Sequence, residues 1–248
     1  MQYDLSVVVS YRLRKERFHE FLRTDGISHL MVPVPRCKKC SKPIRQEYES
    51  SGLCYDCCFA VNPEDNCLER VIAAALYIPR VNGYNHSQEI IDLKERGLHA
   101  PAYANVLLHI MTQERCEPRS DDILVPIPQS SPRGITAGPL ALAQALRSLT
   151  GAKVKECIRF NREVLKQKKL KSMPERLKNV SGSMDCDVYF TKGRIYLVDD
   201  IFTTGSTMKE ACRVVHEKNA KIVIGLVAGR DSKPDSLVHA GVIEVVKD

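Results

Sequence analysis

Two acidic residues followed by a run of hydroxyl side chains make 194–207 the most chemically suggestive stretch of the chain. Ile195–Val198 is apolar and predicts a buried strand, and Asp199 and Asp200 come at its carboxyl end. Open α/β sheets bind their ligands outside that end of the strands. Because buried carboxylates without partners are costly, we expect the acidic pair to face a ligand crevice.

The turn after the acidic pair has the composition of an anion site. Gly205 permits a close approach between the backbone and a ligand, and a helix is predicted over 207–218. Backbone N–H groups at a helix N-terminus attract phosphate. Further donors are the hydroxyl groups of Thr203, Thr204, Ser206 and Thr207. Phosphate donors thus stand beside acceptors for sugar hydroxyls, which suits a ribose 5-phosphate; the alternative is an ordinary strand–turn–helix with capping hydroxyls.

Four cysteines have the spacing of a metal site. Cys37 and Cys40 form one CxxC pair, Cys54 and Cys57 form another, and thirteen residues separate the pairs. Four thiolates can hold Zn²⁺ tetrahedrally with no open position, so the zinc would be structural. Cys58 could replace Cys57, or the four could be free cysteines in a loop. The five remaining cysteines are expected as small core or surface residues; they are Cys67, Cys116, Cys157, Cys186 and Cys212.

Strands and helices alternate along the part of the chain that must position these residues. Strands are predicted over 71–78, 122–128, 154–160, 194–200, 221–228 and 241–246, and helices over 87–96, 101–113, 138–149 and 207–218. Ser87 is expected to cap the first helix, and Gly97 and Gly151 are expected to end the first and third. Near-continuous apolar strands between helices predict an α/β fold with a mostly parallel sheet covered on both faces.

The N-terminal residues 1–35 read as an added piece. A strand is predicted over 3–11, a short basic helix over 12–22, and an extended linker over 32–35, where prolines restrict the backbone.

The string 194–207 resembles the signature of type I phosphoribosyltransferases, with four apolar residues, two acidic ones and Thr-Thr-Gly-Ser-Thr. Together with the two CxxC pairs it resembles the ComF family, whose members are also called GntX-like or amidophosphoribosyltransferase-like proteins. Residues 91–97 are similar to the family's Leu-Lys helix, and 122–128 to its Val-Pro-Val-Pro strand. A spaced element of the family is matched by Gln167, Leu170, Arg176 and Asn179.

The resemblance covers about residues 36–230 and implies a type I phosphoribosyltransferase fold with a small N-terminal zinc ribbon. Three parts are expected: an extension over 1–35, the zinc ribbon over 36–66 and the phosphoribosyltransferase-like domain over 67–248. The implied ligand is phosphoribosyl pyrophosphate or a related ribose phosphate, bound with Mg²⁺. Asp199 and Asp200 would hold the ribose hydroxyls and 203–207 the 5′-phosphate. Transfer of the phosphoribosyl group would release pyrophosphate.

The loop after the strand 122–128 departs from the family pattern. The family has an arginine-rich loop followed by Arg-Gly-Phe-Asn-Gln, whereas 129–136 is shorter and holds one arginine, Arg133, which would bind the pyrophosphate. One lost charge-assisted contact to a leaving group costs about 2–4 kcal/mol in the barrier. Lys94 and the basic residues after 166 are candidates to compensate, although Lys94 could instead lie on an exposed helix face.

Positive charge is concentrated in one block. The net charge is +7, and 153–178 holds ten Lys or Arg residues and only three Glu residues. Such a block attracts phosphate on a nucleotide or a nucleic acid, and the alternative is a solvated basic surface. It supports a competing function, a non-enzymatic or ligand-sensing adaptor acting with nucleic acid or a protein assembly. ComF relatives are associated with DNA uptake, which favours that alternative.

An effector in a larger assembly, for example in phage defence, is a third hypothesis, with 1–35 as the element that docks a partner or oligomer. The chain lacks Trp and has 6% aromatic residues, so it offers no platform for stacking bases. No apolar run approaches the roughly 18 residues of a membrane helix, and the N-terminus has no secretory pattern. We therefore expect a cytoplasmic protein without a membrane partner, in which CxxC pairs bind metal.

Overall fold

The computed structural model describes residues 10–13, 19–24, 27–31, 36–44, 50–54, 57, 67–77, 86–129, 137–165, 173–232 and 243–246. A five-stranded sheet in the order β4-β10-β9-β5-β6 lies at its centre. Its strands are β4 (Arg70–Tyr77), β5 (Ile123–Pro126), β6 (Lys153–Val154), β9 (Ile195–Phe202) and β10 (Val223–Asp231). Every pairing in this sheet is parallel, so the carboxyl ends of all five strands meet at one edge.

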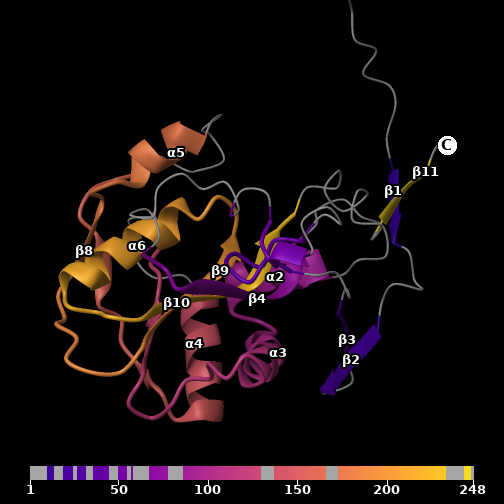
Figure 1. Ribbon diagram of the computed structural model, residues 1–248, viewed down its shortest axis with the longest axis horizontal. Coiled ribbons are helices and arrows are strands. Elements are labelled where there is room, and N and C mark those ends of the chain that lie inside the picture. Colours follow the sequence, from indigo (N-terminus) through magenta and orange to yellow (C-terminus); the bar gives the residue numbers. More distant parts are fainter. Residues whose placement is uncertain are drawn as a thin grey trace, which may run out of the picture.

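Helices cover both faces of the sheet, as the sequence predicts (Figure 1). One face carries α2 (His86–Arg96), α3 (Ala100–Gln113) and α4 (Ala137–Thr150), and the other carries α6 (Ser206–Glu217) with α5 (Met173–Val180) beside it. The alternation of β9 produces the two layers, because successive side chains point to opposite faces. Ile195 and Leu197 belong to the core under α6, whereas Tyr196 and Val198 belong to the core under α2, α3 and α4.

Most element ends differ from the prediction by one to three residues, and two differences need explanation. The run 154–160 is not one strand, because the exposed residues Lys155 and Glu156 separate β6 from β7 (Ile158–Phe160). Strand β7 leaves the main sheet and pairs antiparallel with β8 (Met184–Cys186). Helix α2 begins at His86, so Ser87 lies inside the helix and is not its N-cap. Gly97 does end this helix, with φ of 72° and its N–H bonded to the carbonyl of Leu93 at 2.7 Å.

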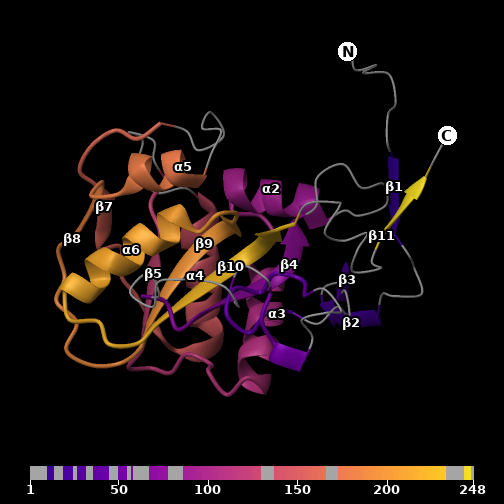
Figure 2. The same ribbon diagram turned by 45° about the horizontal axis from the view of Figure 1, so that its top comes forward.

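The N-terminal helix predicted over 12–22 is wrong. β1 (Ser10–Leu13) and β2 (His19–Thr24) are strands, and β2 pairs antiparallel with β3 (Ile27–Met31). The sequence Asp-Gly at 25–26 is typical of two-residue hairpin connections and is the signal that the helix prediction missed. β1 pairs antiparallel with β11 (Ile243–Val246), so the last strand lies outside the main sheet (Figure 2). The predicted strand before residue 10 and the linker over 32–35 lie outside the described residues.

The cysteine-containing segment 36–44 lies against β4, an edge strand of the main sheet. Ser41 Oγ donates to the carbonyl of Val71 at 2.6 Å, and the N–H of Val71 donates to the carbonyl of Lys39 at 2.8 Å. Arg36 Nη1 donates to the carbonyl of Ala73 at 2.9 Å. The segment therefore satisfies main-chain groups that an exposed edge strand would leave open. Within the described part of the chain, no helix has the length and apolar character needed to cross a membrane.

Candidate functional site

The acidic pair lies within the last half of β9, two residues before the strand ends. By alternation, Asp199 shares the α6 face with Leu197, and Asp200 shares the α2 face with Val198. Asp200 is buried and Asp199 is half-buried. Each carboxylate accepts a main-chain bond from the next residue, at 2.9 Å from Asp200 N and 2.7 Å from Ile201 N. The pair therefore straddles the carboxyl edge of the sheet, where the sequence placed it.

Lys94 of α2 reaches the buried member of the pair. Its Nζ lies 3.1 Å from Oδ1 and 2.9 Å from Oδ2 of Asp200. Burial is the largest influence and lowers the pKa of Lys94, but the charge and hydrogen bond of Asp200, together with the charge of Asp199, outweigh it and the net shift is upward. Lys94 therefore remains cationic at the sheet edge and does not merely extend from an exposed helix face.

The N-terminus of α4 lies close to Lys94 because of a glycine. A Cβ at Gly138 would stand 2.9 Å from the Cα of Lys94 and 2.9 Å from the carbonyl oxygen of Leu93. Only a residue without a side chain lets the two helices approach this far. Helix α4 begins at Ala137, directly after the loop that the sequence associates with pyrophosphate. A second helix N-terminus thus lies at the candidate site.

Asp199 holds its proton unusually tightly. Burial raises its pKa, the negative charge of Asp200 raises it further, and Lys94 offsets part of the shift, for a pKa of about 8. Asp199 therefore keeps its proton to a higher pH than an ordinary carboxyl group, beside the ion pair of Asp200 with Lys94. Such a pair can both donate and accept hydrogen bonds, which is the chemistry that a diol requires.

The turn into α6 depends on Gly205. Its φ is 79°, and a Cβ there would lie 2.5 Å from Cζ of Phe202. Helix α6 begins at Ser206, one residue before the prediction, and its first turn holds no acidic side chain and receives no side-chain cap from its N-cap residue. Thr204 Oγ1 and Ser206 Oγ lie 3.0 Å apart. Two of the hydroxyls predicted for an anion therefore lie together at the N-terminus of α6, a few residues after the acidic pair.

Two arginines of the predicted site, Arg133 and Arg194, are not found beside the acidic pair in the described residues. Arg133 and the rest of 130–136 lie outside the described residues, so the residue expected on the pyrophosphate remains a prediction. Arg194 opens the signature string but lies at the opposite end of β9 from the acidic pair. Its Nη2 lies 2.9 Å from Asp122 Oδ2, and its N–H donates to Asp122 Oδ1 at 2.7 Å. This contact fixes the first residues of β5 and β9 side by side and is structural.

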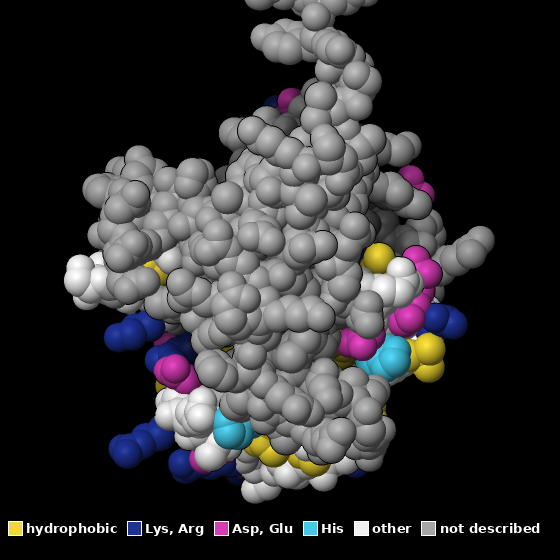
Figure 3. All heavy atoms as spheres, turned by 90° about the vertical axis from the view of Figure 1, so that its right-hand side faces the viewer, with side chains coloured by type: hydrophobic (Ala, Val, Ile, Leu, Met, Phe, Trp, Pro, Cys, Tyr) yellow, Lys and Arg dark blue, Asp and Glu magenta, His cyan; other side chains and the backbone are white. Residues whose placement is uncertain are grey.

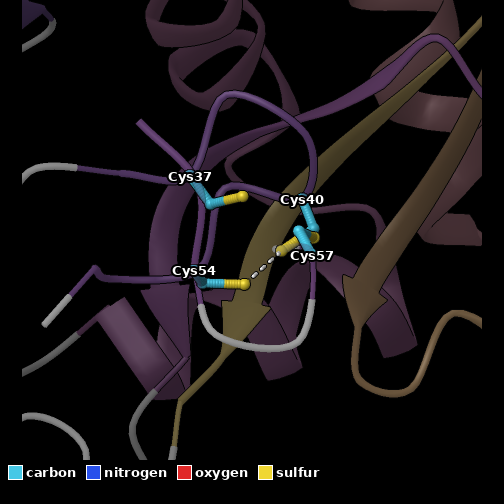
Figure 4. A group of neighbouring side chains, drawn as sticks. All are labelled: Cys37, Cys40, Cys54 and Cys57. Atoms are coloured by element: carbon cyan, nitrogen blue, oxygen red, sulfur yellow. Dashed lines mark hydrogen bonds between the residues drawn. The ribbon is translucent and has the colours of Figure 1, made fainter. Parts of the chain in front are cut away.

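The four predicted zinc ligands come together. Their sulfur atoms all lie within 4.8 Å of one another, and those of Cys40 and Cys54 are 3.7 Å apart. The side chains point toward a common centre (Figure 4). A Zn–S bond of about 2.3 Å in a tetrahedron requires sulfurs about 3.8 Å apart. The cluster therefore fits a four-thiolate metal site; Cys58 lies outside the described residues.

Local backbone bonds hold the two CxxC pairs in place. The N–H of Lys38 donates to the carbonyl of Gly52 at 3.0 Å, which joins the first pair to the residues before the second. Hydrogen bonding from Cys40, together with Cys54 and Cys57, lowers the pKa of Cys37. Hydrogen bonding with Cys37, Cys40 and Cys54 raises the pKa of Cys57. Four such thiols cannot all ionise side by side unless a cation compensates their charge, which is the role of a bound metal.

A buried charged residue that the sequence analysis missed is Arg230, near the end of β10 and next to the turn into α6. It is 7% exposed, and its guanidinium donates to the carbonyl oxygens of Phe202 and Thr203, each at 2.8 Å. The signal was an arginine directly after the apolar run of a predicted strand, since a buried guanidinium must find acceptors. Its partners could not be read from the sequence, since Phe202, Thr203 and Cys40 are far from it along the chain.

The basic block 153–178 is described in part, without residues 166–172 and without the side chain of Arg176. Arg159 is paired with Asp187, and Arg162 donates to two main-chain carbonyl oxygens near the end of α5. The two described arginines of the block thus have partners within the chain. On the side of the molecule that Figure 3 shows, the visible described side chains include Asp and Glu as well as Lys and Arg.

No family model matches the chain, and neither does any curated protein sequence.

Proposed function

We propose that the chain binds phosphoribosyl pyrophosphate, or a closely related ribose phosphate, at the carboxyl edge of its sheet, as a protein of the ComF-like, type I phosphoribosyltransferase kind. One observation carries the proposal. Asp199 and Asp200 lie in the last half of a buried parallel strand, and an uncapped helix N-terminus begins at Ser206, only a few residues later. Acceptors for sugar hydroxyls and donors for a phosphate are thus supplied by one continuous segment.

Each part of the ligand has a matching group. The 5′-phosphate would lie in the turn 203–207, where main-chain N–H groups and hydroxyls converge at the start of α6. The ribose hydroxyls would bond to the acidic pair. Asp200 is paired with Lys94 and can accept, whereas Asp199, with a pKa of about 8, can donate until it loses its proton.

The pyrophosphate end of the ligand requires positive charge. Lys94 supplies a cation at the sheet edge, and its side chain is 40% exposed, so the ammonium can reach a ligand without leaving Asp200. The start of α4 lies next to it. Arg133 is the further candidate from the sequence. Mg²⁺ bound with the ligand would neutralise the phosphate oxygens, and carboxylates such as those of the acidic pair are oxygen ligands that suit it.

Transfer of the phosphoribosyl group is the reaction proposed for this site. The bond between C1′ and the pyrophosphate oxygen breaks, with its electron pair leaving on pyrophosphate. The acceptor forms a new bond to C1′ through its lone pair and then releases its proton. The chain's contribution is to hold the phosphate and ribose in place and to set cationic groups beside the leaving group. Because 129–136 holds a single arginine for the leaving pyrophosphate, we expect the chain to bind the ligand well but to transfer the phosphoribosyl group slowly.

Calorimetric titration of phosphoribosyl pyrophosphate with Mg²⁺ tests the proposal. Wild-type protein should bind the ligand, and the double variant Asp199→Asn with Asp200→Asn should not. Asp185→Asn is a matched control, since Asp185 is an exposed aspartate on β8. Circular dichroism would establish that each variant is folded. Unchanged binding in the double variant would show that the acidic pair is not the ribose site.

A further inference from the structure

Arg230 touches three separate parts of the chain from the end of β10. Its Nη1 donates to the carbonyl oxygens of Phe202 and Thr203, each at 2.8 Å. The same nitrogen lies 3.1 Å from the carbonyl of Asp231, and Nε donates to the carbonyl of Cys40 at 3.1 Å. A guanidinium has five N–H donors in a fixed plane, so acceptors on different segments are held at fixed relative positions.

On one side, these bonds control the entrance to the anion loop. Phe202 is the last residue of β9, and Thr203 is the first residue of the loop. The guanidinium of Arg230 lies 4.9 Å from the centroid of the Phe202 ring. That ring in turn fills the space that a Cβ at Gly205 would occupy, with Cζ at 2.5 Å. Arg230 thus fixes Phe202, and Phe202 defines the path of the backbone into α6.

On the other side, Arg230 reaches a residue of the four-cysteine cluster. Cys40 belongs to the set of four convergent sulfurs, and its own carbonyl is the acceptor of the Nε bond. The position of this carbonyl is set by the short turn 37–41, in which the N–H of Ser41 donates to the carbonyl of Cys37 at 2.9 Å. A metal that draws the four sulfurs together would therefore fix the acceptor that orients Arg230.

The other contacts between the cysteine segment and the sheet lead elsewhere. Ser41 and Lys39 bond to Val71, and Arg36 bonds to Ala73, both on β4. In the sheet order, β10 separates β4 from β9, so these contacts do not touch the loop. Arg230 on β10, in contrast, bonds directly to both the cysteine cluster and the loop. Removing a bond to β4 and removing Arg230 should therefore have different effects on the loop.

We infer that metal binding at the four-cysteine cluster positions the anion loop through Arg230, so the two sites are coupled. Arg230 is a positioning residue in this scheme, because it acts on the loop backbone and not on a ligand. The loop's role as a phosphate site rests on the proposed function, but the coupling itself does not. Because coupling between sites is reciprocal, an anion in the loop should also change the environment of the metal.

Hydrogen–deuterium exchange of the full chain tests the coupling without any ribose ligand. Peptides from 199–209 should exchange about tenfold faster in wild type after zinc is removed with a chelator, the change expected when one charge-assisted bond to the loop is released. In Arg230→Met the same peptides should already exchange fast with zinc bound, and chelation should add little. Arg230→Lys should restore part of the zinc response, since an ammonium can donate but lacks the planar fork.

Ser41→Ala is the matched control. It removes the bond to Val71, so exchange should rise in peptides from β4, while the zinc response of 199–209 stays as in wild type. Unchanged exchange of the loop after zinc removal from wild type would overturn the inference. An equal zinc response in wild type and in Arg230→Met would overturn it as well, because the signal would then travel by another route.

A second measurement separates this inference from the proposed function. Co²⁺ in place of zinc gives the four-thiolate centre a visible spectrum, and ribose 5-phosphate should shift that spectrum in wild type but not in Arg230→Met. The loop could respond to zinc while ribose 5-phosphate neither binds nor shifts the spectrum. That result would refute the proposed ligand but not the coupling. Binding of ribose 5-phosphate with an unaltered spectrum would contradict the reciprocal coupling.

Discussion

Nζ of Lys94 lies 2.9 Å from Oδ2 and 3.1 Å from Oδ1 of Asp200, so the buried carboxylate of β9 has its cation on another element, α2. The two side chains differ in environment, since that of Asp200 is 4% exposed and that of Lys94 is 40% exposed. Lys94 can therefore move toward solvent or a ligand, whereas Asp200 cannot. A change at Lys94 should therefore leave the carboxylate of Asp200 buried without its cation.

Lys94→Met should destabilise the fold by about 1–2 kcal/mol, because it leaves the buried Asp200 carboxylate without its cation. The value is below that of a fully buried pair, since Lys94 is partly exposed and solvent screens its charge. Urea unfolding followed by circular dichroism would measure it.

The double variant Lys94→Met with Asp200→Asn is the control for this prediction. It removes both charges, so its loss of unfolding free energy should be smaller than the sum of the losses in the two single variants. Strict additivity of the three unfolding free energies would mean that the ion pair contributes nothing.

Asp199 should make the stability of the ligand-free protein depend on pH. Its pKa of about 8 in the folded chain lies above the ordinary value of about 4 in the unfolded chain, so the folded state binds the proton more tightly. The stability that this proton provides is complete below about pH 4 and is lost as pH rises through 8. Asp199→Asn cannot ionise, so its unfolding temperature relative to wild type should rise between pH 5 and pH 9.

The exposed variant Asp185→Asn should show no such trend with pH, since Asp185 lies on β8, outside the acidic pair. Thermal unfolding of the three proteins at several pH values is the measurement. A constant difference between Asp199→Asn and wild type across that range would mean that the acidic pair does not share a proton.

Gly205→Ala should disrupt the loop for two separable reasons. The positive φ of 79° disfavours any side chain, and the new Cβ would meet the ring of Phe202. Gly151→Ala provides the matched control, because Gly151 has φ of 74° and nothing within 4 Å of its Cβ position. Both variants carry the backbone cost of about 1 kcal/mol, and Gly205→Ala should lose more.

The excess loss in Gly205→Ala should shrink when Phe202→Leu is added, since the smaller side chain vacates the space. Unfolding free energies of these three variants, and of Phe202→Leu alone, are the readout. If Gly205→Ala and Gly151→Ala are equally destabilised, the ring of Phe202 does not constrain the turn.

Cys54→Ser should reduce the zinc content from one ion per chain to well below one. A hydroxyl is a poor replacement for a thiolate in a four-sulfur site. Metal analysis by mass spectrometry would count the zinc, and Cys116→Ala is the control, since Cys116 is buried near Tyr196 and away from the cluster. One tightly held zinc in both variants would exclude Cys54 as a ligand.

The sequence predicts the candidate site where its signals are local. A contiguous apolar run ending in Asp199 and Asp200, a glycine in the turn and two CxxC pairs each specify their structure over a few neighbouring residues. The pairing of Lys94 with Asp200 spans 106 positions, and that of Arg230 with Cys40 spans 190. Such contacts depend on the order of strands in the sheet, which composition does not reveal.

The incorrect predictions have the same origin. The apolar pattern of 154–160 is interrupted at Lys155 and Glu156, but the sequence gives no sign that the chain leaves one sheet for another there. Strand β1 finds its partner at the other end of the chain, in β11. Over so short a segment, helix and strand patterns are nearly equivalent, and long-range pairing decides between them.

A crystal structure of the chain with phosphoribosyl pyrophosphate and Mg²⁺ tests the central proposal most directly. We expect electron density for the 5′-phosphate at the turn 203–207 and for the ribose hydroxyls at Asp199 and Asp200, with Lys94 turned toward the pyrophosphate. Density for the ligand at any other place, or an empty sheet edge at saturating ligand, would contradict the proposal.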